Sequence, residues 1–240
     1  MKCYKTADGK FLKTTEGKLV SPEGNVTITD KELSFFDAYA QSGAIGKYSN
    51  ITLSANSISE WNGVKIAYGY MKGSTIPYDL TIDFNGAKDL ALNEGFASAD
   101  ADGKNITIKN ADIVDFYLGF SAAKINTVRF ENVRFIQSIQ SLFQNCSVKQ
   151  ILGNADVSKV KYMHNTFINA YFLNKIELKH WRVDFNISSS TQFDTAALVK
   201  IISNLDDTGS AHTLTIGTTN LAKLSEAQIK VATDKGWNLA

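Results

Sequence analysis

Side chains that could perform chemistry are few in this sequence and stand far apart. The three histidines, His164, His180 and His212, lie in different parts of the chain, and none has a metal-binding spacing or a neighbouring nucleophile motif. The sequence also contains no glycine-rich phosphate loop and no nucleophile elbow. These patterns predict a protein that is not an enzyme.

Metal and redox chemistry have equally little support. Asp100-Ala101-Asp102-Gly103 is similar to the start of a calcium loop, but the later ligands and the closing glutamate are missing, so we expect a turn. Cys3 and Cys146 are too few and too far apart in sequence to imply a disulfide framework, and we interpret both as free thiols. We expect no metal and no cofactor.

The composition argues against several classes of partner. The 25 basic and 24 acidic residues leave a formal charge of +1, which gives no overall field to attract nucleic acid or an anionic membrane. No uninterrupted apolar run reaches about 18 residues, so we expect no membrane insertion. Residues 1–10 contain no apolar secretory segment. We therefore expect a protein that is made in a cytoplasm and is not secreted through a signal peptide.

A short strand pattern recurs along most of the chain and must position the remaining candidate residues. In Ile106-Thr107-Ile108 the two apolar side chains face inward and the polar one faces outward, because side chains alternate across a strand. Successive copies start 25, 29, 26, 22, 23, 25 and 38 residues apart, a spacing typical of a repeated supersecondary unit. The copies begin at Val26, Ile51, Leu80, Ile106, Val128, Ile151, Ile176 and Leu214.

The outward positions of these strands are nearly all polar, which supports the register because a one-residue slip would bury them. Repeat proteins usually hold protein partners on this sheet face, so its charged residues are the first candidates for partner contacts. The alternative is that a face rich in threonine and charge is merely solvated. The candidates are Asp83, Lys109, Arg129, Glu131, Glu177 and Lys179.

A large aromatic residue recurs in phase with the later strands, at intervals of 24, 23, 24 and 26 residues. Such a recurrence predicts a stacked column in the core, opposite the sheet. The predicted members are Phe96, Phe120, Phe143, Phe167 and Phe193.

Two segments near the N-terminus differ from the repeat. Residues 1–24 carry two acidic-glycine pairs that predict two β-hairpin turns, and they either pack on the first repeat or dock as an arm on another subunit. In residues 57–79, Trp61, Tyr68 and Tyr70 lie among glycines. This aromatic segment either forms an exposed loop that binds sugar or protein, or packs against its own repeat.

Residues 195–240 have the pattern of a C-terminal cap, which closes the core of a repeat protein with a polar outer face. A second helix is predicted from Leu224 to about Asp234, followed by a glycine stop and a short strand. A first helix is predicted from an i, i+3, i+4, i+7 apolar stripe. That stripe consists of Leu198, Ile201, Ile202 and Leu205.

Residues 142–181 resemble the BspA-like leucine-rich repeat family. They repeat its pattern of Phe, Asn and Cys, then a strand, then Asp-x-Ser-x-Val and Met, as in Phe143 to Cys146 followed by Asp156 to Met163. The resemblance implies an α/β solenoid over residues 25–240. This is a right-handed superhelix with a parallel β-sheet on one side and irregular turns and short helices on the other, preceded by a small N-terminal β-arm.

The family's asparagine after the strand core is replaced in four repeats, which predicts that its hydrogen-bonded asparagine ladder is interrupted here. The replacing residues are Ala111, Val133, Asp156 and Trp181.

The segment from Leu214 to Trp237 resembles the closing cap of repeat proteins encoded by phages and prophages of gut bacteria. The resemblance implies a virion protein, a tail or head appendage, in which residues 1–24 dock to the particle. The solenoid would then bind a neighbouring virion protein or a host surface receptor or glycan, and homo-oligomerisation is left open. The alternative is a bacterial BspA-like surface adhesion or protein-interaction module.

Overall fold

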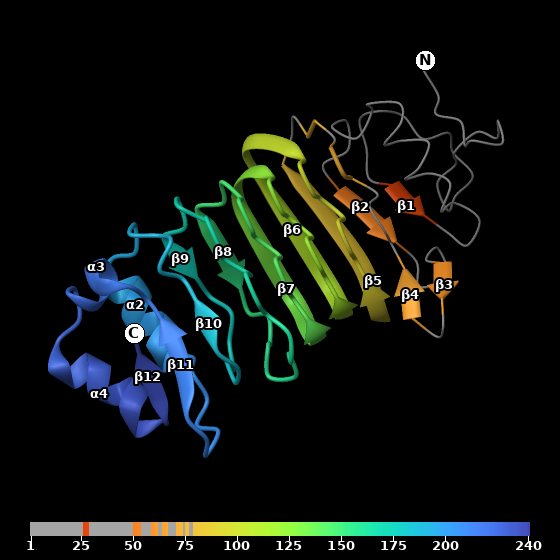
Figure 1. Cartoon of the computed structure of the whole chain (residues 1–240). Coiled ribbons are helices and arrows are strands. Elements are labelled where there is room, and N and C mark those ends of the chain that lie inside the picture. The colour runs from red at the N-terminus through yellow and green to blue at the C-terminus, as the bar shows by residue number, and fades with distance from the viewer. Residues whose placement is uncertain are drawn as a thin grey trace.

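The computed structural model describes residues 26–28, 50–53, 59–61, 64–66, 71–73, 75–76 and 79–240. These residues form a parallel β-sheet of several strands with few helices (Figure 1). The predicted arm, residues 1–24, lies outside the described residues. The main sheet runs in the order β1 (Val26–Ile28), β2 (Asn50–Leu53), β5 (Leu80–Ala91), β6 (Asp100–Asp115), β7 (Lys124–Ser138), β8 (Gln150–Gly153) and β9 (Lys175–Ile176).

The pairing of β5 to β9 follows the predicted register. Ile106 pairs with Leu80 on one side and Val128 on the other, and Ile151 pairs with Val128 and Ile176. All five side chains are buried. The register differs at β2, where Ile51 pairs with Ile82 instead of Leu80. A shift of two residues preserves the alternation of faces, so the apolar pattern does not distinguish the two registers.

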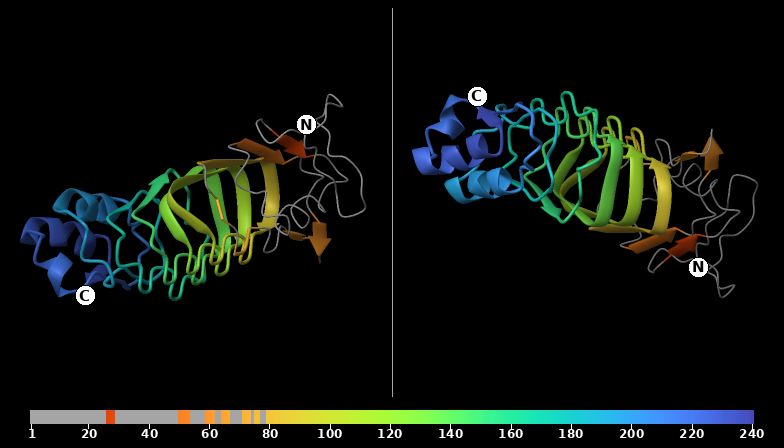
Figure 2. Two further views of the ribbon diagram at one scale, coloured as in Figure 1. Left: turned by 90° about the horizontal axis from the view of Figure 1, so that it is seen from above. Right: turned by 90° about the horizontal axis from the view of Figure 1, so that it is seen from below.

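Strands β5, β6 and β7 are 12, 16 and 15 residues long, much longer than the predicted three-residue cores. They bend, and Figure 2 shows them curving around the core with their connecting turns stacked along one edge. At the bends Asn110 and Asn132 have φ values of 54° and 53°. Pairing resumes beyond them, with Ile113 opposite Phe135. Asparagine tolerates this left-handed conformation better than most residues, which permits a sharp bend without interrupting the sheet.

The predicted aromatic column is present for four of its five members. The ring centroids of Phe96, Phe120, Phe143 and Phe167 lie 4.7, 5.4 and 6.0 Å apart in succession, with interplanar angles of 10°, 2° and 6°. The extension to Phe193 was wrong. That residue is buried, but Phe167 contacts Trp181 instead, at 6.3 Å and 60°. The column therefore ends where the regular repeat ends.

The C-terminal part forms a second, three-stranded parallel sheet with three helices beside it (Figure 1). Both predicted helices and the final strand are present, and the apolar stripe of the first helix is buried. The strand at Leu214 does not continue the main sheet, because Leu214 pairs with Phe185 and Leu239. The elements are β10 (Phe185–Asn186), α2 (Thr195–Ser203), β11 (His212–Thr215), α3 (Thr218–Leu221), α4 (Glu226–Asp234) and β12 (Trp237–Leu239). Within the described part of the chain, no helix has the length and apolar character needed to cross a membrane.

Candidate interaction surface

The outer face of the main sheet brings five of the six predicted contact residues together. Asp83, Lys109 and Glu131 pair in one row across β5, β6 and β7. Lys109 Nζ lies 2.8 Å from Glu131 Oε2, and Asp83 Oδ1 accepts a hydrogen bond of 2.9 Å from Asn110 Nδ2. Much of the charge in this row is therefore satisfied within the sheet itself.

Glu177 is held in a similar way at the far side of this face. Its carboxylate accepts a hydrogen bond of 2.9 Å from the Gly153 backbone N–H, and Lys175 Nζ lies 2.9 Å from Oε1. Burial raises the pKa of Glu177, but the hydrogen bonds from Lys175 and Gly153 and the charges of Lys175 and Arg129 outweigh burial. The pKa of Glu177 is therefore lower than usual, and the side chain is ionised at neutral pH.

Arg129 occupies the middle of this face. It pairs with Thr107 on β6 and with Leu152 on β8. Among the described residues its guanidinium forms no direct ion pair or side-chain hydrogen bond. Its charge nevertheless contributes to lowering the pKa of Glu177. Leu152 is the one apolar residue at the predicted outward positions of β5 to β9, and it is half-buried. We call Arg129 and Leu152, with the Lys109–Glu131 and Lys175–Glu177 ion pairs beside them, the Arg129 surface.

Lys179, the sixth predicted contact, belongs to another row. Its backbone pairs with Asp156, Asp156 pairs with Arg134, and Arg134 pairs with Asp112. This row lies beyond the bends at Asn110 and Asn132, so Lys179 does not join the Arg129 surface. The prediction that Lys179 shares a face with the other five residues was wrong because the strands are longer than expected. The three-residue pattern does not indicate that the strands continue beyond a bend.

Arg134 and Asp112 form the strongest ion pair of this second row. Arg134 Nε donates to Asp112 Oδ1 at 2.7 Å, and Nη2 lies 2.5 Å from Oδ2. The hydrogen bond from Arg134 lowers the pKa of Asp112, burial opposes this, and the charges of Arg134 and Lys88 add to the lowering. The sequence analysis missed this pair, although the i, i+22 spacing of Asp112 and Arg134 matches one repeat.

An asparagine ladder is present after all, but it is displaced from the expected positions. Asn110 Nδ2 donates to Asp83, Asn132 Nδ2 donates to Asn110 Oδ1 at 3.1 Å, and the Asn132 backbone N–H donates to Asn154 Oδ1 at 3.1 Å. Asn110 and Asn132 each precede by one residue the position where the family pattern places its asparagine. The ladder therefore follows the bends of the strands and stabilises them.

The predicted aromatic segment is described only in part. Trp61 lies at the end of β3 (Ser59–Trp61), which forms an antiparallel hairpin with β4 (Val64–Ile66). β4 in turn pairs with the second half of β5, at Leu90 and Ala91. Tyr68 and Tyr70 lie outside the described residues. Trp61 therefore belongs to a hairpin attached to the main sheet.

A different apolar cluster is exposed, and the sequence analysis did not identify it. Ile168, Tyr171 and Phe172 are 39%, 56% and 57% exposed, next to buried Phe167. The Tyr171 hydroxyl donates to Asn169 Oδ1 at 2.9 Å. The sequence did contain a signal, namely three large apolar residues within five positions. The segment between the column phenylalanine and the next strand is also one residue longer here than in the preceding repeat.

The described histidines and cysteine stand apart from one another. His180 Nδ1 lies 3.0 Å from Asp206 Oδ1, and His212 Nδ1 lies 3.1 Å from Asp184 Oδ1. No group of three or more metal-ligating residues forms within the described ranges. Burial raises the pKa of Cys146 to about 12, so its thiol is protonated at neutral pH and a poor nucleophile.

Comparison with known proteins gives no relative. No family model, curated protein or solved structure matches the chain.

Proposed function

We propose that this chain is a non-enzymatic binding and structural protein, built as a leucine-rich-repeat solenoid, that contacts its partner through the Arg129 surface. One observation carries the proposal. Arg129 forms no direct ion pair among the described residues, and it lies beside Leu152, the one apolar residue at the predicted outward positions of β5 to β9. An unpaired arginine next to an apolar side chain resembles the centre of a protein interface.

The surrounding ion pairs suit the rim of such an interface. Both ion pairs, Lys109–Glu131 and Lys175–Glu177, are partly exposed. Within each pair the two charges neutralise one another, so the pairs add little binding energy. They do fix the orientation of a partner by their pattern of charge. Strands β6, β7 and β8 beneath this surface are each paired on both sides, which reduces the entropy lost on binding.

For the assembly we propose a phage particle, with residues 1–24 as the docking arm. This part of the proposal rests on the resemblance of residues 214–237 to phage repeat-protein caps. It is tested by quantitative mass spectrometry of particles purified from a bacterium that carries the gene. The chain should copurify at a fixed ratio to the major capsid protein. Recovery from the bacterial cell surface, with none in the particles, would instead support the adhesion module.

Deletion of residues 1–24 tests the arm. The shortened chain should unfold at the same temperature as the full chain, because the main sheet and its core lie in later residues, yet it should no longer join particles. Circular dichroism melting and cosedimentation measure the two properties. If the deletion unfolds the protein, residues 1–24 cap the first repeat and the docking role is lost.

A further inference from the structure

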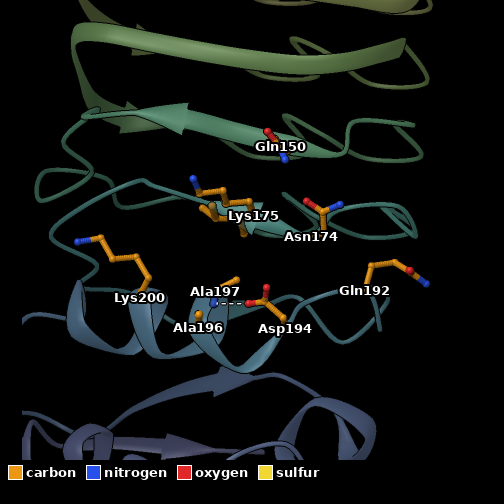
Figure 3. Close-up of a pocket in the computed structure, with 9 residues that line it drawn as sticks. Gln150, Asn174, Lys175, Gln192, Asp194, Ala196, Ala197 and Lys200 are labelled. Carbon is orange, nitrogen blue, oxygen red and sulfur yellow. Dashed lines mark hydrogen bonds between the residues drawn. The ribbon is translucent and has the colours of Figure 1, made fainter.

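A cavity of about 510 Å³ lies where the main sheet meets α2 (Figure 3). Strands β8 and β9 and the residue before β9 form one wall, and α2 with the segment before it forms the other. Its volume is within the usual range for small-molecule sites. It lies beside the Arg129 surface and shares Lys175 with it, but neither Arg129 nor Leu152 lines the cavity.

The polar groups that line the cavity are divided between its two sides. In Figure 3 the side chains of Lys175 and Lys200 extend toward one side, whereas Asn174 and Gln192 lie toward the other. Gln150 adds a third amide from β8. One side therefore offers ammonium groups, and the remainder offers amides that can each donate and accept hydrogen bonds.

The charges in the cavity differ in how far they are already satisfied. Asp194 accepts a hydrogen bond of 2.7 Å from the Ala197 backbone N–H and caps α2 (Figure 3). Lys175 is paired with Glu177 at 2.9 Å. Lys200 forms no ion pair with any described residue, so its ammonium is available to an anionic ligand.

The amides decide which kind of anion fits. Sulfate offers acceptors only, and phosphate at neutral pH offers just one or two hydroxyl donors, so either anion leaves amide oxygens of the cavity without donors. A sugar hydroxyl both donates and accepts, which matches an amide. Ala196 and Ala197 supply apolar contact for the C–H groups of a sugar ring. A ligand that carries one carboxylate and several hydroxyls uses both sides of the cavity.

We propose that this cavity binds a sugar acid, with its carboxylate at Lys200 and Lys175 and its ring hydroxyls at Gln150 and Asn174. The site is independent of the partner proposed for the Arg129 surface.

Saturation-transfer NMR titration of the full chain with D-glucuronate tests this site. D-glucose lacks the carboxylate and acetate lacks the hydroxyls, so each should bind at least about tenfold more weakly than glucuronate. Lys200→Met and Asn174→Ala should each weaken glucuronate binding by about tenfold or more. Methionine has nearly the helix propensity of lysine, so α2 should remain intact.

Lys230→Met is the matched control, because Lys230 lies on α4, pairs with Asp234 and does not line the cavity. It should leave the affinity for glucuronate unchanged. Absence of binding by glucuronate, galacturonate and N-acetylneuraminate would overturn the proposal, as would equal binding in Lys200→Met. Tighter binding of inorganic phosphate or of an acidic peptide than of glucuronate would overturn the sugar assignment. None of these results affects the particle and Arg129 experiments, so the two proposals fail separately.

Discussion

At Gly153 the backbone of β8 passes directly against that of β7. Gly153 has a φ of 104°, and a Cβ atom built there would lie 1.9 Å from the Phe130 carbonyl oxygen. The neighbouring Asn154 N–H donates to that same oxygen at 3.1 Å. Glycine is therefore required at the third position of the strand pattern, where an apolar side chain was expected. The Gly153 N–H donates its hydrogen bond to the Glu177 carboxylate.

Gly153→Ala should lower the free energy of unfolding by about 3 kcal/mol, because neither the backbone oxygen nor the left-handed conformation can adjust cheaply. Gly86→Ala is the matched control. It has a φ of 75° but no atom within 4 Å of the added Cβ, so it should cost only about 1 kcal/mol. Urea unfolding compares the two, and equal losses would show that strain alone, without a clash, acts at Gly153.

Acid should weaken the ion pair of Asp112 and Arg134. The pKa of Asp112 is lowered in the folded chain, chiefly by the hydrogen bond from Arg134. A lowered pKa contributes stability that is fully present above the unfolded value of about 3.9 and is lost as pH falls through the folded value. Asp112→Asn should therefore lose about 1 kcal/mol at pH 6 and almost nothing near pH 2.

The control for this pH series is Asp102→Asn, at an exposed residue of β6 for which no ion pair is found among the described residues. Its effect should be small at both pH values. A loss in Asp112→Asn that stays constant from pH 6 to pH 2 would contradict the assigned role of the carboxylate.

At the scale of elements, the sequence predicted the strands well but not their continuation. Ile106 and Ile108 alternate as a strand should, but the next buried positions are Ala111 and Ile113. The extra residue is Asn110, in the left-handed conformation, and it breaks the period of two that marks a strand. The second row of charges, and the cavity between β9 and α2, depend on such bends and on contacts between distant repeats, which local patterns do not encode.

Lys235 joins two elements of the C-terminal part. Its Nζ donates to the carbonyl oxygens of Ile202, Ser203 and Leu205, at 3.3, 2.9 and 2.7 Å, and so caps the end of α2 from the end of α4. Lys235 therefore acts on the C-terminus of a neighbouring helix, where a cation stabilises the unpaired carbonyl groups.

Lys235→Met should lower the free energy of unfolding by about 2 kcal/mol, since it removes charge-assisted hydrogen bonds to three carbonyl groups. Lys230→Met on the same helix loses only an exposed pair with Asp234 and should cost less than about 0.5 kcal/mol. Urea unfolding of both variants measures the difference. Similar small losses would show that Lys235 does not hold α2 and α4 together.

At the scale of the whole molecule, one core runs through the repeats and then changes character. The phenyl rings stack from Phe96 to Phe167, and the core then continues through Trp181, which stacks on Phe185 at 4.1 Å, to Trp237. The second sheet thus closes the end of the first through aromatic contacts. Because the fold supplies a rigid, regular support, single side chains on its outer face can be changed with little effect on stability.

The most direct test of the proposed binding role is cosedimentation of Arg129→Ala with purified particles. Binding should weaken by at least about tenfold, or about 1.4 kcal/mol, while the free energy of unfolding changes by less than about 1 kcal/mol. Arg182→Ala is the control, because Arg182 pairs with Asp206 away from the Arg129 surface, and it should bind like the unaltered chain. Equal binding of Arg129→Ala and the unaltered chain, or no binding by the unaltered chain itself, would contradict the account.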